Sequence, residues 1–340
     1  MKVASTAAVG SGPSLPAAAE RPLLTTAIIA LLASILVAVP AYAAMADDPY
    51  VLTLASRILV FALAAVGLNI ALGYGGMVSM GHSMYLGLGA YMVVLLHGVG
   101  IDSGWLQLLA IGVAVAAVAV AVGWVALRTQ GIAFIMITLA FAQLFYYLFV
   151  SLKAYGGDEG MRLEQLSSFG ALTGNRTALY YALLACLGVV AYATHRLVGS
   201  RFGLVLRASR INERRVKAVG TAPLPYRLAA YVLSALVCGV AGFFLVNLTG
   251  FVSPAYLEWT VSGELIVMAV LGGVGTIVGP ILGAAGLLLV EEGLKGLTEH
   301  WPMILGPLIV LLVLGLRRGL WSMLPVPTHD GGDTATKARE

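Results

Sequence analysis

The stretch SRFGLVLRASRINERRVKAVG, residues 200–220, is the one long polar island in an otherwise apolar chain. Its single acidic residue is Glu213. The spacing of its basic residues predicts one basic face of a helix, formed by Arg207, Arg210, Arg214 and Lys217. A second set at helical spacing predicts an apolar stripe, formed by Leu204, Ala208 and Ile211. Gly220 and Pro223 predict the end of this helix. Such a helix can lie on anionic lipid or dock into a cytoplasmic partner.

The composition around this stretch is that of a membrane protein. Of 340 residues, 60% are hydrophobic and 11% are charged, whereas soluble domains carry about 25% charged residues. The basic residues gather in one loop without interleaved aromatic residues, which argues against nucleic-acid binding. Cys186 and Cys238 lie inside apolar runs and are expected to be buried packing residues.

The chain contains ten apolar segments, at 23–44, 50–72, 83–97, 104–127, 131–151, 177–197, 226–248, 259–272, 277–290 and 302–316. The segments 83–97, 259–272 and 277–290 are shorter than the ~20 residues of a full crossing, and we expect them to be tilted, re-entrant or half-helices. We therefore expect an all-α polytopic transmembrane bundle of about 8–10 membrane segments, with short or broken helices. The first segment ends in a sequence that resembles a signal-peptidase site, but its length favours an uncleaved helix.

The distribution of basic residues predicts the orientation. With both termini in the cytoplasm, 15 of the 20 lysine and arginine residues lie inside, and the outer loops collect most of the acidic residues. The opposite orientation reverses this bias. The stretch 200–220 is therefore expected in the cytoplasm.

Glycine-rich breaks interrupt two apolar segments, at 72–76 (LGYGG) and 271–275 (LGGVG). Paired breaks of this kind point to a translocation pathway in transporters, although close helix packing explains them equally well. The residues that we assign to the breaks and to the pathway beside them are Gly73, Gly75, Gly76, Ser79, Gly81, His82, Gly272, Gly273, Gly275 and Gly279, together with Glu264.

Two of the polar residues have competing interpretations. Glu264 is the one acidic residue inside a predicted span, where it could hold a cation or an ammonium group or lie near the outer interface. His82 is expected to be a packing histidine.

In the outer loop 152–176, Gly156, Gly157, Asp158 and Glu159 predict a tight turn that either contacts a partner or is solvated.

Motifs of catalysis and cofactor binding are missing from the sequence. There is no phosphate-binding loop of the form GxxxxGK[ST], so the chain cannot hydrolyse ATP by that mechanism. The motifs HExxH, CxxC and GxSxG are also missing. We expect no enzymatic activity and no cofactor bound by this chain.

Five blocks of sequence, in order, resemble the LivM-type permeases of bacterial branched-chain amino-acid ABC importers, within the LivH/LivM permease family. The blocks are GLNIALGYGGMVSMGHSMYLGLGAY at 67–91, GIAFIMITLAFAQLFYY at 131–147, YGGDEGM at 155–161, SRFGLVLRASRINERRVKAVG at 200–220 and SGELIVMAVLGGVGTIVGPILGA at 262–284.

The resemblance implies a permease subunit in the bacterial inner membrane. Its implied partners are a second, LivH-like permease subunit, two cytoplasmic ABC ATPases that use the ATP, and a periplasmic substrate-binding protein. The residues 156–159 would contact the binding protein. The coupling residues toward the ATPase would be Ser200, Phe202, Gly203, Arg207, Arg210, Asn212, Glu213, Lys217 and Gly220.

Composition and charge also divide the chain. We expect a permease domain at 22–320 with a cytoplasmic coupling loop at 199–225, flanked by a disordered cytoplasmic segment at 1–21 and a cytoplasmic tail at 321–340; the resemblance covers about residues 64–290. Two alternatives remain at this point: an ion-coupled secondary transporter with Glu264 and the glycine breaks as its cation site, and a membrane anchor. The substrate stays open between branched-chain amino acids, other amino acids, urea and short amides.

Overall fold

The computed structural model describes residues 20–163, 165–169, 175–315 and 319–323. Within them the helices are α1 (Glu20–Met45), α2 (Pro49–Asn69), α3 (His82–Gly98), α4 (Gly104–Ala126), α5 (Ile132–Ser151), α6 (Arg176–Gly199), α7 (Arg201–Ile211), α8 (Glu213–Ala218), α9 (Pro223–Thr249), α10 (Trp259–Gly272), α11 (Gly279–Lys295) and α12 (Trp301–Gly315). A π-helical turn, Ile70–Tyr74, extends α2, and short 3-10 turns cover Lys153–Tyr155, Pro254–Leu257 and Leu320–Met323.

Each of the ten predicted apolar segments coincides with a helix, so the prediction of a polytopic helical bundle is confirmed. Helices are the expected outcome because a backbone in lipid must satisfy its own hydrogen bonds. Among the described residues, five helices are long and apolar enough to span a membrane: α2 with its π-helical turn, α4, α5, α6 and α9. The three segments predicted to be short are α3, α10 and α11, with 17, 14 and 17 residues.

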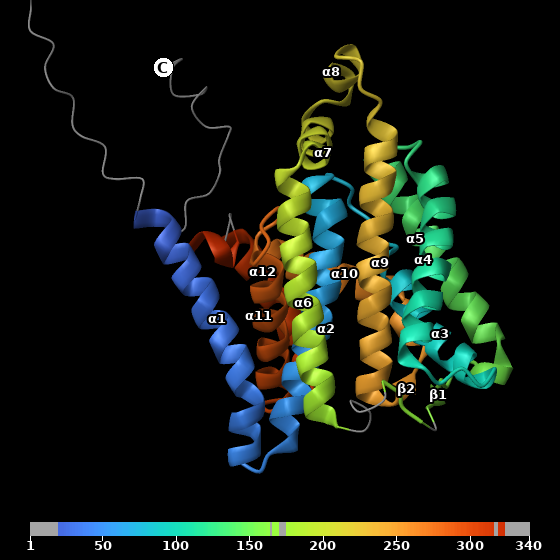
Figure 1. The fold of residues 1–340 in the computed structure, drawn as a ribbon, viewed down its shortest axis with the longest axis vertical. Coiled ribbons are helices and arrows are strands. Elements are labelled where there is room, and N and C mark those ends of the chain that lie inside the picture. Colours follow the sequence, from blue (N-terminus) through green and yellow to red (C-terminus); the bar gives the residue numbers. More distant parts are fainter. Residues whose placement is uncertain (1–19, 164, 170–174, 316–318, 324–340) are drawn as a thin grey trace, which may run out of the picture.

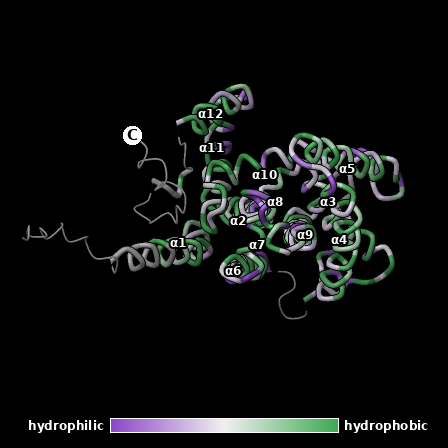
Figure 2. Tube along the Cα trace, turned by 90° about the horizontal axis from the view of Figure 1, so that it is seen from above, coloured by the Kyte–Doolittle hydropathy of each residue, from purple (hydrophilic) through white to green (hydrophobic). Residues whose placement is uncertain are grey.

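The centre of the bundle is formed by α2 and α9. The most apolar windows of these two helices are 61% and 67% buried, against 22–28% for α4, α5 and α6. The view along the bundle shows α2 and α9 in the middle, with α1 and α12 on one side and α4 and α5 on the other (Figure 2). The chain therefore buries one helix from each half of the sequence at its core.

Glycines bring α3 and α9 into close contact. A side chain at Gly89 would collide with the backbone of Gly239 on α9. A polar bond lies beside this contact, because the Nε2 atom of His82 is 2.7 Å from the Oγ of Ser234. His82 is fully buried in this packing, as a core histidine would be.

The two ends of the molecule differ. At one end α7 and α8 project beyond the long helices, and at the other end lie two short strands (Figure 1). The strands β1 (Met161–Arg162) and β2 (Phe251–Val252) pair antiparallel, with Met161 opposite Val252. The sequence did not predict them, because two residues are too few to show an alternating pattern. They tie the outer loop to the end of α9.

Candidate functional site

The polar stretch 200–220 folds as a hairpin of two helices, so the prediction of one continuous helix with one basic face is wrong. The backbone of Asn212 is extended, at φ −157° and ψ 100°, and separates α7 from α8. Its side-chain oxygen accepts a hydrogen bond of 3.1 Å from the backbone N–H of Arg215, which caps the start of α8.

Several predicted coupling residues brace this hairpin internally. Gly203 is buried where α7 meets the end of α6, and a side chain there would collide with the backbone of Val198. Arg207 donates hydrogen bonds of 3.3 Å to the carbonyl groups of Gly203 and Val198. Phe202 lies 5.6 Å from Tyr226, ring centre to ring centre. These contacts fix α7 against α6 and α9.

The turns at the ends of the hairpin use two more predicted residues. Ser200 stands between α6 and α7, and its hydroxyl donates to the carbonyl of Leu197. Gly220 has a φ of +85°, which glycine adopts without strain, and it follows α8 as predicted. Pro223 then begins α9.

Glu213 faces back toward the bundle. Its carboxylate lies 2.8 Å from the Nζ of Lys217 and 3.1 Å from Arg227 of α9, and it accepts a hydrogen bond from Gln130 between α4 and α5. The hydrogen bond from Lys217 lowers the pKa of Glu213, burial opposes this shift, and the charge of Arg227 supports it. Glu213 therefore anchors α8 to two other elements.

An apolar groove opens on the solvent side of the hairpin. We call it the coupling groove; it has a volume of about 370 Å³ and is lined by Leu204, Val205, Ala208, Ile211, Asn212, Arg215, Val216, Val219 and Thr221. The predicted apolar stripe of α7 forms one wall. Leu204, Ile211 and Val219 are 64%, 84% and 85% exposed. Val216 of α8 and Val219, just after α8, complete the groove, and sequence reasoning missed them because it treated the stretch as one helix.

Arg210 points from α7 into the bundle. Its guanidinium group donates a hydrogen bond to the backbone carbonyl of Gly73, in the π-helical turn after α2. Its aliphatic part covers Gly76, where an added Cβ would be 2.7 Å from the Cγ of Arg210. Arg210 therefore joins the hairpin to the first glycine break.

The two glycine breaks lie side by side. Asn69, which is 1% exposed, donates a hydrogen bond of 2.7 Å to the carbonyl of Thr276 and accepts one of 3.0 Å from the N–H of Gly275. A Cβ on Gly73 would be 2.6 Å from the backbone nitrogen of Gly275. We call Asn69, Gly73, Gly275 and Thr276 the glycine junction. Asn69 was not among the predicted site residues; its signal was a lone amide in the apolar run just before the break.

The other predicted break residues pack closely. Gly75 lies against the carbonyl of Ala71, Gly81 lies against Thr138 of α5, and Ser79 is buried. Three more of them form the α10–α11 hairpin: Gly273 has a φ of +122°, and side chains at Gly272 or Gly279 would collide with the facing backbone.

Glu264 lies apart from the glycine junction. It is exposed on α10, and eight residues separate it from Gly272, which amounts to about 12 Å along a helix. The charged groups that act on its carboxylate are Glu291, Arg57, Lys295 and Glu258. The structure therefore does not bring Glu264 and the glycine breaks into one cation site.

The outer turn that was predicted to contact a binding protein is sharply folded. Gly156 and Gly157 have φ angles of +91° and +51°, and Gly157 is buried. Asp158 and Glu159 are exposed at the tip of the turn. The glycines shape the turn, and the two carboxylates are the groups that a partner could reach.

The comparisons with known proteins agree with this architecture. Residues 50–314 match the family model described as "Branched-chain amino acid transport system / permease component". The permease protein LivM of Escherichia coli strain K12, from a high-affinity branched-chain amino acid transport system, is 26% identical over 298 residues, which cover 79% of this chain and 69% of that protein. The LivH protein of the same strain is 27% identical over 283 residues, covering 76% of this chain and 90% of LivH. No solved structure matches the chain significantly. The chain is a multi-pass membrane protein that belongs to the family of branched-chain amino acid transport permeases.

Proposed function

We propose that the chain is a transmembrane subunit of an ATP-driven importer of branched-chain amino acids in a bacterial inner membrane. The substrate class is supported by the LivM and LivH relatives, which are named as permeases of a high-affinity branched-chain amino acid transport system. A second permease subunit would complete the pathway, and two separate ATPases would bind and hydrolyse the ATP. The chain would act as the moving membrane part, with no catalytic role of its own.

The observation that carries this proposal is the two-sided contact of α7. Its solvent side lines the coupling groove, a mainly apolar surface that includes one basic residue, Arg215. Its inner side holds Gly73 through Arg210. A partner that pulls on α7 would therefore act directly on a break in a membrane helix.

The next contact extends the path to a second break. Asn69 links the end of α2 to the loop between α10 and α11 through its bonds with Gly275 and Thr276. Because glycine-rich, non-helical segments can change conformation at low cost, this loop is a place where motion can enter the outer half of the bundle. An ATPase in the coupling groove would thereby bias both breaks at once.

The outer face would receive the amino acid from a periplasmic binding protein. Asp158 and Glu159 are exposed there, on the turn that Gly156 and Gly157 form. Carboxylates at the rim of an interface set the rate and orientation of docking more than its final affinity. We expect neutralising these two residues to slow delivery without impairing ATPase docking.

Purification of a tagged chain from its native membranes tests the proposal. We expect ABC ATPases to co-purify, and we expect vesicles with the recovered complex and the binding protein to take up labelled L-leucine only with ATP. Recovery without any ATPase would overturn the proposal. Uptake that an uncoupler abolishes while ATP is maintained would instead establish the ion-coupled alternative.

A further inference from the structure

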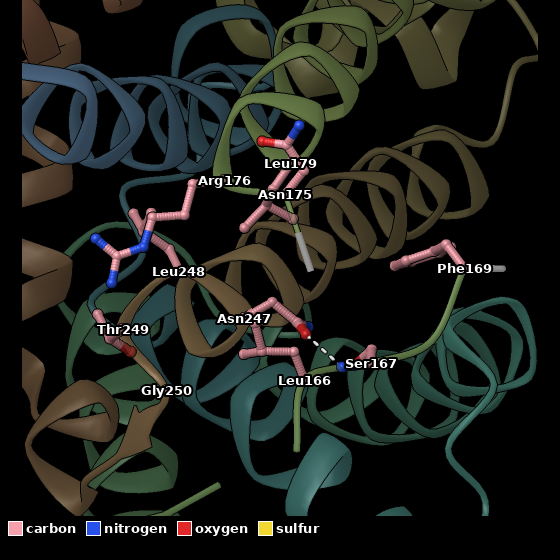
Figure 3. A pocket seen from close by; sticks show the side chains of 10 residues that line it. All are labelled: Leu166, Ser167, Phe169, Asn175, Arg176, Leu179, Asn247, Leu248, Thr249 and Gly250. Atoms are coloured by element: carbon pink, nitrogen blue, oxygen red, sulfur yellow. Dashed lines mark hydrogen bonds between the residues drawn. The ribbon is translucent and has the colours of Figure 1, made fainter. Parts of the chain in front are cut away.

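A cavity of about 210 Å³ lies between the outer ends of α6 and α9, away from the glycine junction and from the coupling groove (Figure 3). Taking ~30 Å³ per water molecule, it has room for about seven waters, and so for one small solute. Its floor is fixed by Asn247, which is buried and accepts a hydrogen bond of 2.9 Å from the N–H of Ser167. The cavity is therefore a formed feature of the outer surface.

One side of the cavity is positive. Arg176 is the first residue of α6, and its guanidinium group points toward Thr249 at one edge of the cavity (Figure 3). Within the described residues it makes no ion pair. The N-terminus of α6 adds the positive end of a helix dipole beside it. A carboxylate entering the cavity would meet both.

The end of α9, toward which Arg176 extends, is negative. The last turn of α9 ends at Thr249, and Gly250 closes the helix with a φ of +63°. The final carbonyl groups of a helix lack partners within the helix and carry the negative end of its dipole. Leu248, Thr249 and Gly250 all line the cavity. An ammonium group would be favoured on this side.

The remaining wall is apolar. Leu166, Leu179 and Leu248 line it from the outer loop, α6 and α9. Such a wall accommodates an aliphatic side chain of a few carbon atoms, because burying each methylene contributes about 0.8 kcal/mol. The guanidinium group of Arg176 and the C-terminal end of α9, together with an apolar wall, match an aliphatic α-amino acid, which carries its ammonium and carboxylate groups on one carbon.

We propose that this cavity is an entry site that holds an aliphatic α-amino acid at the outer face, its carboxylate on Arg176 and its ammonium group at the end of α9. The inference rests on the proposed transport function and assigns the first point of contact on this chain. Arg176 would be a binding residue, and the α9 end would select against solutes that lack an amine.

The probe is tritiated L-leucine, bound to the purified full-length chain in lipid nanodiscs without ATP or partner proteins. Unlabelled L-leucine is expected to displace it. 4-Methylpentanoate, which lacks the amine, and 3-methylbutylamine, which lacks the carboxylate, are each expected to compete at least about tenfold more weakly, because each leaves one charged contact unmade.

Variants at two arginines separate binding from general charge effects. Arg176→Gln is expected to weaken leucine binding at least about tenfold, and Arg176→Lys less, since lysine keeps the charge without the planar fork. Arg162→Gln removes an exposed arginine of β1 that does not line the cavity, and leucine binding should stay unchanged.

Three results would overturn the entry site: no displaceable binding to the unmodified chain, equal binding by the Arg176→Gln and Arg162→Gln variants, or equal competition by either half-ligand and leucine. None of these measurements involves the ATPases. If leucine binding failed while ATP-driven uptake persisted, the entry site alone would be wrong. If leucine bound but no ATPase co-purified, the proposed function alone would be wrong.

Discussion

Replacement of Arg210 by alanine would cut the contact between α7 and the glycine junction. In the structure the guanidinium group donates to the carbonyl of Gly73, and the side chain covers Gly76. A hydrogen bond with a charged partner contributes about 1.5–3 kcal/mol. At 1.4 kcal/mol per factor of ten, this equals roughly 10-fold to 150-fold in an equilibrium between two conformations. The lower end applies because the bond is only half-buried.

The assay is the number of leucine molecules imported per ATP hydrolysed in vesicles that contain the complete transporter. We expect Arg210→Ala to lower this ratio about tenfold while ATP hydrolysis continues, because the ATPase would still dock on the other side of α7. Arg210→Lys should give an intermediate number of leucine molecules per ATP, since the lysine ammonium group can donate to a carbonyl but lacks the planar geometry of a guanidinium group.

Arg214→Ala is the matched control. Arg214 is an exposed basic residue of the same hairpin, and within the described residues no hydrogen bond or ion pair involves its side chain. If Arg214→Ala lowered the ratio as much as Arg210→Ala did, the general positive charge of the hairpin would be the cause. An unchanged ratio in Arg210→Ala would refute the mechanical link.

Three further predictions concern packing, pH and docking. Gly272→Ala should prevent recovery of folded protein, because its Cβ would collide with the backbone at the start of α11. The control is Gly263→Ala on the same helix, whose Cβ would meet nothing within 4 Å. Size-exclusion chromatography should show an unchanged yield of monodisperse protein for the control and a loss for Gly272→Ala. The hydrogen bond with Lys217 lowers the folded-state pKa of Glu213 below its ordinary value of 4.5. The contribution of Glu213 to stability is therefore complete above about pH 4.5 and is lost as the pH falls through the lowered pKa, which the melting temperature should show. Glu213→Gln should abolish that part of the pH dependence. Ile211→Asp puts a charge into the coupling groove and should reduce ATPase co-purification by about tenfold or more while the chain still inserts; full recovery of the ATPase would place docking elsewhere.

The membrane-spanning part of the fold could be predicted to within a few residues. Predicted spans at 104–127 and 131–151 correspond to α4 (Gly104–Ala126) and α5 (Ile132–Ser151). The reason is that lipid leaves a long apolar segment one stable backbone structure, the helix. Length and hydropathy therefore carry most of the information about these elements.

The candidate site was less predictable because it depends on single polar side chains. The spacing from Arg207 to Lys217 fits an unbroken helix, yet Asn212 caps a new one, and both outcomes are compatible with local propensity. The partner of Asn69 lies 207 residues away in the sequence, at Thr276. No periodic pattern reports a contact over that separation, so the meeting of the two breaks required the structure.

The glycine packing of α3 on α9 has a consequence for how the protein is made. Ser234, the partner of His82, follows it by 152 residues. The ribosome synthesises α3 well before α9. Until α9 is inserted, the glycine face of α3 and the imidazole of His82 are therefore exposed to lipid or to other, transient contacts. A nascent chain that stops before Pro223 lacks the surface that covers this face. Correct folding of the newly synthesised protein would then depend on one late step, the insertion and packing of α9.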